Sequence, residues 1–154
     1  MDEMDRKILA LLQENARISN AEIARQVGLA SSAIFHRIRK LEEGGVIRGY
    51  HTQLDPRLMG MGMAAFVRVQ TGDGASAEAI VSDLLALPEV QEVHRVVGED
   101  CFFVKVRTRD PQDLARLLDD SIQPIQGVAT TRTTVVLTTA RESLAVPVDR
   151  PFGN

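Results

Sequence analysis

The chain of 154 residues contains a single cysteine, Cys101, which excludes an intrachain disulfide and leaves no cysteine pair for a structural zinc site. It also lacks an excess of positive charge, because 18 Lys and Arg face 21 Asp and Glu and the net charge is -3. A chain with this balance does not attract polyanions as a whole, so any nucleic-acid surface must be local. Hydrophobic residues at 44% and charged residues at 25% are ordinary globular proportions and argue against wholesale disorder.

Long hydrophobic runs are missing as well. The longest uncharged stretch near the middle, Leu58–Val67, is about half of the ~20 apolar residues that a membrane-spanning helix needs. The first fifteen residues carry charged side chains at positions 2, 3, 5, 6, 7 and 14, which a secretory signal does not tolerate. We therefore expect no membrane association, a functional chain that begins at Met1, and a reducing, cytoplasmic setting that suits a lone cysteine.

Sequence motifs for catalysis and cofactors are also missing. No G-x-S-x-G, P-loop or H-E-x-x-H sequence occurs, and His36, His51 and His94 lack the spacing of metal ligands. Residues 60–65 match G-x-G-x-x-A, but the segment that follows is strand-sized, whereas a dinucleotide fingerprint opens a helix. We expect no metal, no cofactor and no nucleophilic catalysis. Cys101 is expected to act as a small apolar residue, and a redox-sensing thiol is the alternative.

The first third of the chain has helical periodicity. Over Met4–Leu41 apolar residues recur three and four apart in three short bursts. Asp2-x-x-Asp5 and Ser19-x-x-Glu22 have the spacing of capping boxes, and Gly28 offers a left-handed end to the second helix. A third helix is predicted over Ser31–Glu43, crossing the second steeply because the turn between them is so short. Residues 46–54 are expected to form an extended connector strand.

From Ala64 onward the pattern changes to short β-rich runs separated by amphipathic segments. Strands are predicted at residues 64–70, 90–97, 101–107 and 131–139, and helices at residues 76–87 and from Asp110 through Leu118. This βαββαβ order is that of a ferredoxin-like unit, which packs two helices on one face of a four-stranded sheet. Phe66, Phe103 and Val135 are expected on the other face, for which a partner subunit is the natural cover.

The fold class is therefore α+β. We divide the chain into a three-helix, winged-helix-like helix-turn-helix domain with its connector strand at residues 1–56, a ferredoxin-like domain at residues 57–140 and a tail at residues 141–154. The tail contains Pro147 and Pro151 and has no helical period, so it is either disordered or lies over a neighbour.

The predicted third helix has the features of a DNA-reading helix. A tight turn before the third helix of such a unit allows that helix to enter the major groove. Residues 31–41 carry three basic side chains and no acidic one, although residues 1–56 balance at eight of each. A basic helix face that is merely solvated is the alternative. The expected DNA contacts are Ser31, Ser32, Phe35, His36 and Arg39 at or near the bases, and Arg37, Lys40 and Arg48 at the phosphates.

Several segments of the chain, taken in order, carry a family resemblance. They are Asp2-x-x-Asp5-Arg6-Lys7-Ile8-Leu9, Arg17-Ile18-Ser19, Ala24, Gly28-Leu29, residues 37–41, residues 45–50, Gly98-Glu99, Lys105-Val106, Gly127-Val128 and Thr133. In this order and spacing they resemble the Lrp/AsnC (leucine-responsive, feast/famine) family of prokaryotic transcription regulators. The resemblance covers residues 1 to about 140.

The resemblance implies that the helix-turn-helix binds operator DNA and that the second domain dimerises and senses an amino acid or related metabolite. It also implies that homodimers assemble into higher oligomers, with octamers expected. The implied effector residues are Gly98, Glu99, Asp100, Cys101, Thr131 and Thr133. In two places the chain departs from the family pattern: Ala30 stands where a capping Ser is usual, and Cys101 where Asp is frequent. For residues 98–101, a plain turn with solvated acids is the alternative.

The predicted function is thus that of a sequence-specific transcription regulator rather than an enzyme, with double-stranded DNA and a small-molecule effector as partners. Sirohaem decarboxylases resemble the same family and provide the enzymatic alternative, for which His51, His94 and Arg95 are the suggestive residues. A further alternative is a DNA-architectural regulator whose second domain serves only for assembly. For the DNA-binding reading, Arg37→Ala should weaken binding to every sequence, whereas Arg39→Ala should relax discrimination by ~1–3 kcal/mol.

Overall fold

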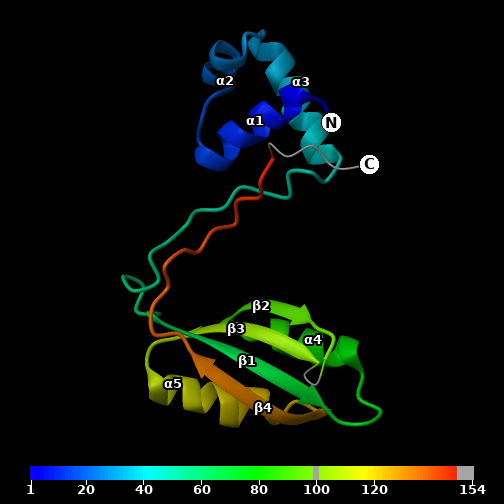
Figure 1. Cartoon of the computed structure of the whole chain (residues 1–154), viewed down its shortest axis with the longest axis vertical. Helices are drawn as coiled ribbons and strands as arrows, with labels where there is room; N and C mark the ends of the chain where they lie inside the picture. The colour runs from blue at the N-terminus through cyan, green and yellow to red at the C-terminus, as the bar shows by residue number, and fades with distance from the viewer. Residues whose placement is uncertain (99–100, 149–154) are drawn as a thin grey trace. The chain divides into compact units, whose positions relative to one another are not determined.

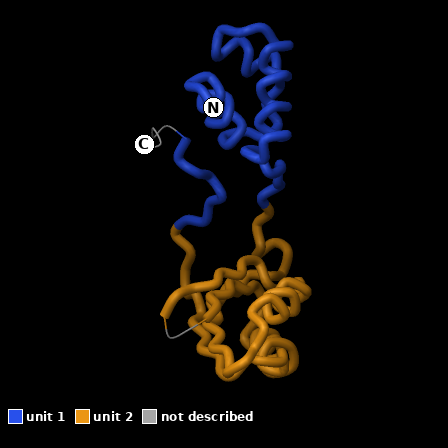
Figure 2. The backbone as a smooth tube through the Cα atoms, turned by 90° about the vertical axis from the view of Figure 1, so that its right-hand side faces the viewer, with its two compact units in different colours: residues 1–53, 141–154 blue, residues 54–140 orange. Residues whose placement is uncertain are grey.

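The computed structural model describes residues 1–98 and 101–148, so Glu99 and Asp100, two of the implied effector residues, lie outside the described residues. The chain divides into two compact units (Figure 2). The first unit is made of residues 1–53 and 141–154, and the second of residues 54–140. The segment after residue 140 therefore belongs to the unit formed by the beginning of the chain.

Residues 3–43 fold into α1 (Glu3–Glu14), α2 (Asn20–Val27) and α3 (Ser31–Glu43), the last with the bounds predicted from the sequence (Figure 1). The predicted capping box of α1 is present: the Asp5 N–H donates to the Asp2 carboxylate at 2.8 Å, and the Asp2 N–H donates to the Asp5 carboxylate at 2.9 Å. Gly28 ends α2 with φ +74°, in the left-handed region. The start of α1 and the end of α2 are thus fixed by local chemistry.

The second predicted capping box is present only in its first half among the described residues. The Glu22 N–H donates to the Ser19 hydroxyl at 3.1 Å, which caps α2. The Glu22 carboxylate accepts hydrogen bonds from Arg25 and Gln26 instead of reaching back to Ser19. The hydrogen bond from the Arg25 guanidinium to this carboxylate is charge-assisted at both ends, and is therefore stronger than one from a neutral backbone N–H.

The first unit has a small core between the helices. It is built on the buried side chains of Ile8, Ile23, Ala24 and Ile34, with Ile38 partly buried beside them. Each fully buried isoleucine contributes about 1.5–3 kcal/mol of transfer free energy. This core fixes which face of α3 points inward and which is left to solvent.

The described part of the second unit forms a sheet with strand order β2-β3-β1-β4, in which every neighbouring pair is antiparallel. The strands are β1 (Met63–Thr71), β2 (Val90–Arg95), β3 (Phe102–Thr108) and β4 (Val128–Val135). The helices are α4 (Ala77–Leu85) and α5 (Pro111–Arg116), and α5 runs on into a π-helical segment, η1 (Leu117–Ile122). This arrangement confirms the predicted ferredoxin-like order.

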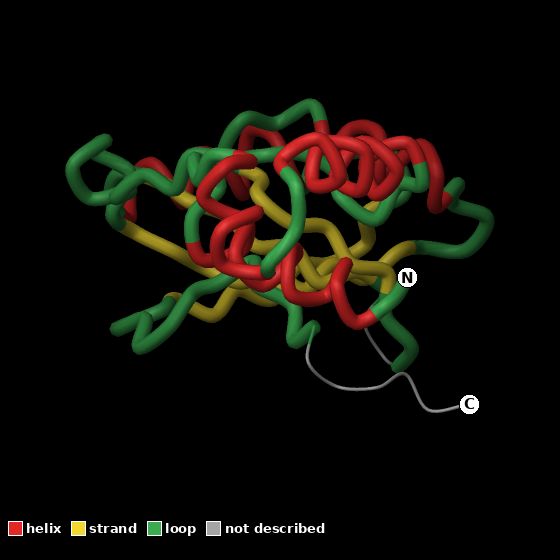
Figure 3. Tube along the Cα trace, turned by 90° about the horizontal axis from the view of Figure 1, so that it is seen from above, coloured by secondary structure: helices red, strands yellow, loops and turns green. Residues whose placement is uncertain are grey.

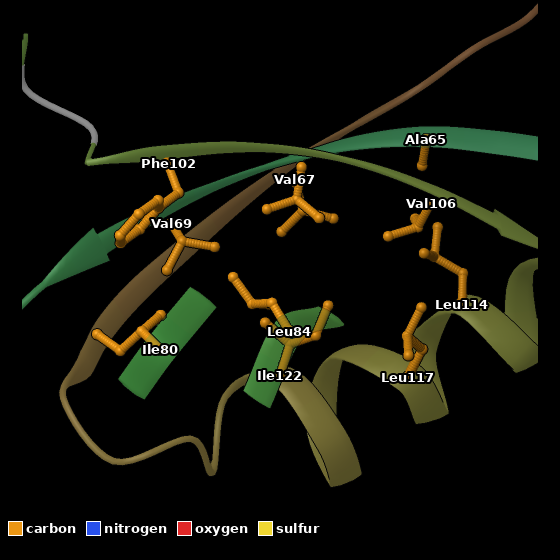
Figure 4. Close-up of a cluster of buried hydrophobic side chains, with 11 residues drawn as sticks. Ala65, Val67, Val69, Ile80, Leu84, Phe102, Val106, Leu114, Leu117 and Ile122 are labelled. Carbon is orange, nitrogen blue, oxygen red and sulfur yellow. The ribbon is translucent and has the colours of Figure 1, made fainter. Parts of the chain in front are cut away.

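The helices of the second unit cover one face of the sheet. Figure 4 shows side chains of β1 and β3 pointing towards those of α4, α5 and η1, with Val67, Val69 and Phe102 on the sheet side and Ile80 and Leu84 on α4. All five side chains are at most 1% exposed. The core therefore lies on a single side of the sheet, and the opposite face is left without a covering element from the described chain.

Two predictions about the fourth strand were wrong. The strand spans residues 128–135 instead of 131–139, because β1 begins at Met63 and offers no partner beyond the bond from the Val136 N–H to the Ala64 carbonyl. Val135 pairs with Ala65, whose side chain is buried in the core, so Val135 lies on the helix-covered side of the sheet. Side chains directly opposite in an antiparallel pair share a face, and the amino-acid pattern did not reveal this register.

The connector and the tail also differ from expectation. Residues 46–62 form no helix or strand, because a strand requires a hydrogen-bonding neighbour and the described chain supplies none there. Residues 136–148 likewise carry no further helix or strand (Figure 3). They are nevertheless attached to the first unit: the Gln13 side chain donates to the Val146 carbonyl at 3.0 Å and accepts from the Val146 N–H at 2.6 Å.

No helix of the described residues is long and apolar enough to cross a membrane.

Candidate functional site

The outer face of α3 carries most of the residues predicted to contact DNA. Ile34 and Leu41 are buried at 0% and 5% exposure, and Ile34 belongs to the first unit's core. Because each residue advances about 100° around a helix, the two buried positions determine which residues lie on the opposite, exposed side of α3, which we call the exposed stripe. The predicted contact residues left exposed are Ser31, Ser32, Phe35, His36, Arg39 and Lys40 on α3 and Arg48 after it.

Arg39 lies in the middle of this exposed stripe. Its guanidinium pairs with Glu43, one turn further along α3, at 2.8 Å, and both side chains are 64% exposed. An exposed i,i+4 pair of this kind contributes only about 0.3–0.5 kcal/mol, so a stronger acceptor can displace it. Arg39 is therefore available for an anionic or base-edge partner.

Phe35 occupies one flank of the stripe, with half of its side chain exposed. Its ring meets the His36 ring edge-on at 5.5 Å between centroids. A groove of about 490 Å³ runs beside it, lined by side chains from α1, α3 and the chain after α3, including Leu12, Phe35, Arg39 and Tyr50. An exposed phenylalanine beside a groove can make apolar contacts with a base edge such as the thymine methyl group.

Tyr50 anchors the segment after α3 to that helix. Its hydroxyl donates to the Glu42 carboxylate at 2.9 Å. Burial and, secondly, this hydrogen bond to an anion raise the pKa of Tyr50 to about 12. The phenol therefore stays protonated throughout the neutral range and keeps Arg48 close to the end of α3.

Arg37 forms ion pairs with Asp2 and Asp5 within the first unit. The sequence, from which we predicted a phosphate contact for Arg37, did not indicate these pairs. One guanidinium nitrogen, Nη1, donates to the Asp2 carboxylate at 2.7 Å and to the Asp5 carboxylate at 2.6 Å. The backbone N–H of Asp5 and then the Arg37 guanidinium lower the pKa of Asp2. These two partners lie 35 and 32 residues before Arg37 in the chain. The only signal for them in the sequence was the pair of acids in the capping box, Asp2-x-x-Asp5.

In the second unit, only some of the implied effector residues lie near one another. The Cys101 N–H donates to the Val69 carbonyl at 2.9 Å, and Thr131 pairs with the same Val69 from the other side of β1. Thr131 thus lies across β1 from Phe102, which pairs with Val69 on the other side, and Cys101 is the residue before Phe102. Cys101 and Thr131 are therefore about 10 Å apart, across two strand spacings. Thr133 pairs with Val67, two residues further from this end of β1.

The residues at this end of the sheet differ in burial and backbone freedom. Thr131 is half-buried and Thr133 exposed, and both lie on the helix-covered side because their partners Val69 and Val67 are core residues. Gly98 has φ +144°, a conformation that favours glycine. The Cys101 sulfur contacts the Thr71 hydroxyl at 3.0 Å, a partner that the sequence reasoning missed.

The uncovered face of the sheet is apolar at its centre. The Phe66 and Phe103 rings stack at 5.2 Å between centroids, as the expectation for this face required. Charged residues surround them, and among these Lys105 pairs with Glu92 at 2.9 Å. Stacked aromatic rings on the open side of a sheet form an apolar patch that favours association.

The residues weighed for other chemistry belong to different units. His51 belongs to the first unit, whereas His94 and Arg95 belong to the second. His94 contacts Glu92 at 3.2 Å. Across residues 1–98 and 101–148, no group of three or more His, Cys, Asp or Glu side chains is placed to hold a metal ion. The G-x-G-x-x-A stretch runs into β1 rather than into a helix, which is the wrong context for a dinucleotide site.

A helix-turn-helix with an exposed basic stripe, followed by an α+β unit, defines a class: DNA-binding regulators that carry a second domain for ligands. Residues 1–48 match the family model of the winged helix-turn-helix DNA-binding domain, and residues 64–146 match that of the Lrp/AsnC ligand binding domain. The chain belongs to the Lrp/AsnC family of transcription regulators, which confirms the resemblance noted in its sequence.

Individual relatives extend over nearly the whole chain. It is 38% identical over 148 residues to the HTH-type transcriptional regulator FL11 of Pyrococcus horikoshii, covering 96% of this chain and 97% of that protein. It is 34% identical over 145 residues to the leucine-responsive regulatory protein of Escherichia coli, covering 93% and 88%. The solved complex of transcriptional regulator NMB0573 with L-Met from Neisseria meningitidis superposes with a TM-score of 0.92 at 28% identity, covering 97% of each chain.

Proposed function

We propose that this regulator binds operator DNA by placing α3 in the major groove, and that it changes its DNA binding when an amino acid occupies the second unit. We further propose that it acts in the cytoplasm and carries out no catalysis. The observation that supports the proposal of DNA binding is the exposed stripe of α3. Ile34 and Leu41 are buried on the opposite side of the helix, so this stripe faces solvent. Ser32, His36 and Arg39 are the base contacts in this proposal, with Ser31 and Phe35 beside them.

Lys40 and Arg48 are the proposed phosphate contacts. Both are exposed, and both lie at or beyond the C-terminal half of α3, where the duplex backbone passes when a helix end enters the groove. Each phosphate neutralised releases counterions, so the logarithm of the affinity should fall linearly with the logarithm of the salt concentration, with a slope of about 0.9 per contact.

The DNA proposal is tested with a duplex that the wild-type chain selects from genomic fragments and a scrambled duplex of equal composition. Arg39→Ala should lower affinity for the selected duplex by about 1–3 kcal/mol and hardly affect the scrambled one. Lys40→Ala should weaken binding to both duplexes and reduce the salt slope by about one. Equal losses for both variants on both duplexes would reject this assignment of roles.

The effector proposal rests on the end of the sheet where Cys101 and Thr131 flank Val69. An amino acid presents an ammonium and a carboxylate, so its site requires acceptors and donors together. We assign the carboxylates of Glu99 and Asp100 to the ammonium group, and the threonine hydroxyls at positions 131 and 133 to polar contacts. Gly98 and Cys101 complete the turn. Similarity to the solved complex of NMB0573 with L-Met supports this ligand class.

A thermal-shift screen with the twenty amino acids tests the effector proposal. An amino acid present at ~100 times its dissociation constant should stabilise the protein by about 2.7 kcal/mol. Thr131→Val should remove that shift, whereas Thr134→Val, on the same strand but facing the other side with Phe66, should keep it. No shift with any amino acid would favour an architectural regulator without an effector.

We also infer that a second copy covers the open face of the sheet, and that the resulting dimers assemble further into octamers. The stacked Phe66 and Phe103 support this assignment. Light scattering should give a multiple of the chain mass for the wild type and a lower one for Phe103→Glu. Phe35→Glu, in the first unit, is the control and should leave the mass unchanged.

A further inference from the structure

Arg37 and Arg39 lie on nearly opposite sides of α3. Two residues separate them by about 200° around the helix, so a helix that presents Arg39 to DNA turns Arg37 away. Arg37 instead lines up with Ile34 and Leu41, three residues before it and four after it, both of which are buried. Its side chain is 34% exposed, compared with 64% for Arg39.

The partners of Arg37 form a rigid acceptor. The α1 capping box holds the Asp2 and Asp5 carboxylates in place through two backbone hydrogen bonds, at 2.8 and 2.9 Å. The helix dipole further favours both anions at this end of α1. Arg37 therefore docks on a pair of carboxylates that is ordered independently of it.

The charge of this cluster is also informative. One guanidinium meets two carboxylates, so the cluster carries +1 - 2 = -1 and repels phosphate. Asp5 is only 14% exposed, so its pair with Arg37 is shielded from water, unlike the surface pair of Lys7 and Glu3 at 57% and 83% exposure. Displacing Arg37 towards DNA would leave the largely buried Asp5 carboxylate without this cation, which is unfavourable.

We propose that Arg37 is a positioning residue that fixes the orientation of α3 on the N-terminus of α1, through Asp2 and Asp5, and that it makes no contact with DNA. Apolar packing of Ile34 and Leu41 is non-directional, whereas charge-assisted hydrogen bonds define an angle. The ion pair thus sets the direction in which the exposed stripe faces. This inference rests on the proposed function, in which α3 reads the groove.

Asp5→Asn separates the two roles because they predict changes of opposite sign. The amide keeps the shape of Asp5 and can still accept the capping hydrogen bond, but it no longer holds Arg37 by charge. If Arg37 positions α3, affinity for the wild-type-selected duplex falls, by roughly 5-fold or more as for a lost base contact, and the salt slope is unchanged. If Arg37 contacts phosphate, the loss of one of its two carboxylate partners makes the guanidinium easier to withdraw from Asp2, and the affinity rises for selected and scrambled duplexes alike.

Arg37→Gln provides the complementary measurement. If Arg37 is a positioning residue, this variant should lose affinity for the selected duplex only, and its salt slope should equal that of the wild type. A phosphate contact would instead lower the affinity for both duplexes and reduce the slope by about 0.9. That second result would overturn the proposal.

The matched control is Glu3→Gln, which removes one negative charge from the same helix end but leaves Arg37 paired. It should leave discrimination between the two duplexes at the wild-type value. All titrations are made well below the melting temperature of each variant. Variants that melt earlier but bind the selected duplex like the wild type would refute a positioning role. A wild-type chain that selects no duplex would defeat the proposed function itself, a result distinct from either pattern of the variants.

Discussion

Gly127 is the position where one added methyl group should be most costly. It precedes β4 with φ +95°, a conformation that side chains rarely adopt. A Cβ built there would lie 2.6 Å from the Cβ of Ala75 and 3.3 Å from the Cδ1 of the fully buried Ile80. The Gly127 carbonyl also accepts from the Gly72 N–H at 2.9 Å, which pins the two segments together and prevents an easy retreat.

The expected cost of Gly127→Ala has two parts. The positive φ contributes about 1–2 kcal/mol, and overpacking against Ala75 contributes about 1–3 kcal/mol. The sum, about 2–5 kcal/mol, is a large share of the stability of a small domain. Gly74→Ala is the matched control, because Gly74 has φ +76° but no atom within 4 Å of a built Cβ. It should lose only the first part.

Amide hydrogen exchange suits the measurement because it reports each unit separately. Exchange of the Val67 and Val104 amides, in the core strands, should give an opening free energy lower by the calculated amount in Gly127→Ala. The Ile23 amide, in the first unit, should be unaffected. Protein concentration must be held constant, since association contributes to stability. Equal losses in Gly127→Ala and Gly74→Ala would show that the clash with Ala75 is relieved at no cost and would refute the reasoning.

Two further predictions concern the first unit. Tyr50 is the only tyrosine and the chain has no tryptophan, so ultraviolet titration of tyrosinate should report its raised pKa, about 12, directly. Its contribution to stability is complete below pH ~10 and is lost as pH rises through about 12. Glu42→Gln should lower the midpoint while burial keeps it above 10; a wild-type midpoint near 10 would contradict the structure. At the start of α3, Ala30 provides no side-chain cap, so Ala30→Ser should stabilise the protein by about 0.5–2 kcal/mol. Calorimetry should then show a higher melting temperature, and a lower one would contradict the missing cap.

Features that depend on neighbouring residues could be predicted from the sequence. The capping box at Asp2 and Asp5, the left-handed end at Gly28 and the bounds of α3 all follow from chemistry within four residues. The order of strands and helices followed too, because periodicity distinguishes the two. The exposed stripe of α3 was predicted for the same reason: the buried Ile34 and Leu41 and the partly buried Ile38 determine which side faces out.

Features that depend on pairing between residues far apart in the chain could not be predicted from the sequence. Val135 was placed on the wrong face because alternation along a strand does not specify the register with β1. The pairing of Arg37 with Asp2 and Asp5 was not predicted, because these partners are more than thirty residues away. A cation on a basic helix appears free until the fold brings an acid to it. The bond between Cys101 and Thr71 escaped notice for the same reason.

The return of the chain to its first unit has a practical consequence for proteolysis. A single cut between α3 and β1 would separate the reading head from the rest of the polypeptide, yet the head would still hold the far end of the other fragment through Gln13 and Val146. The two pieces should then travel together in a native gel and come apart in detergent. The rate at which they separate after dilution would measure the strength of this C-terminal clasp.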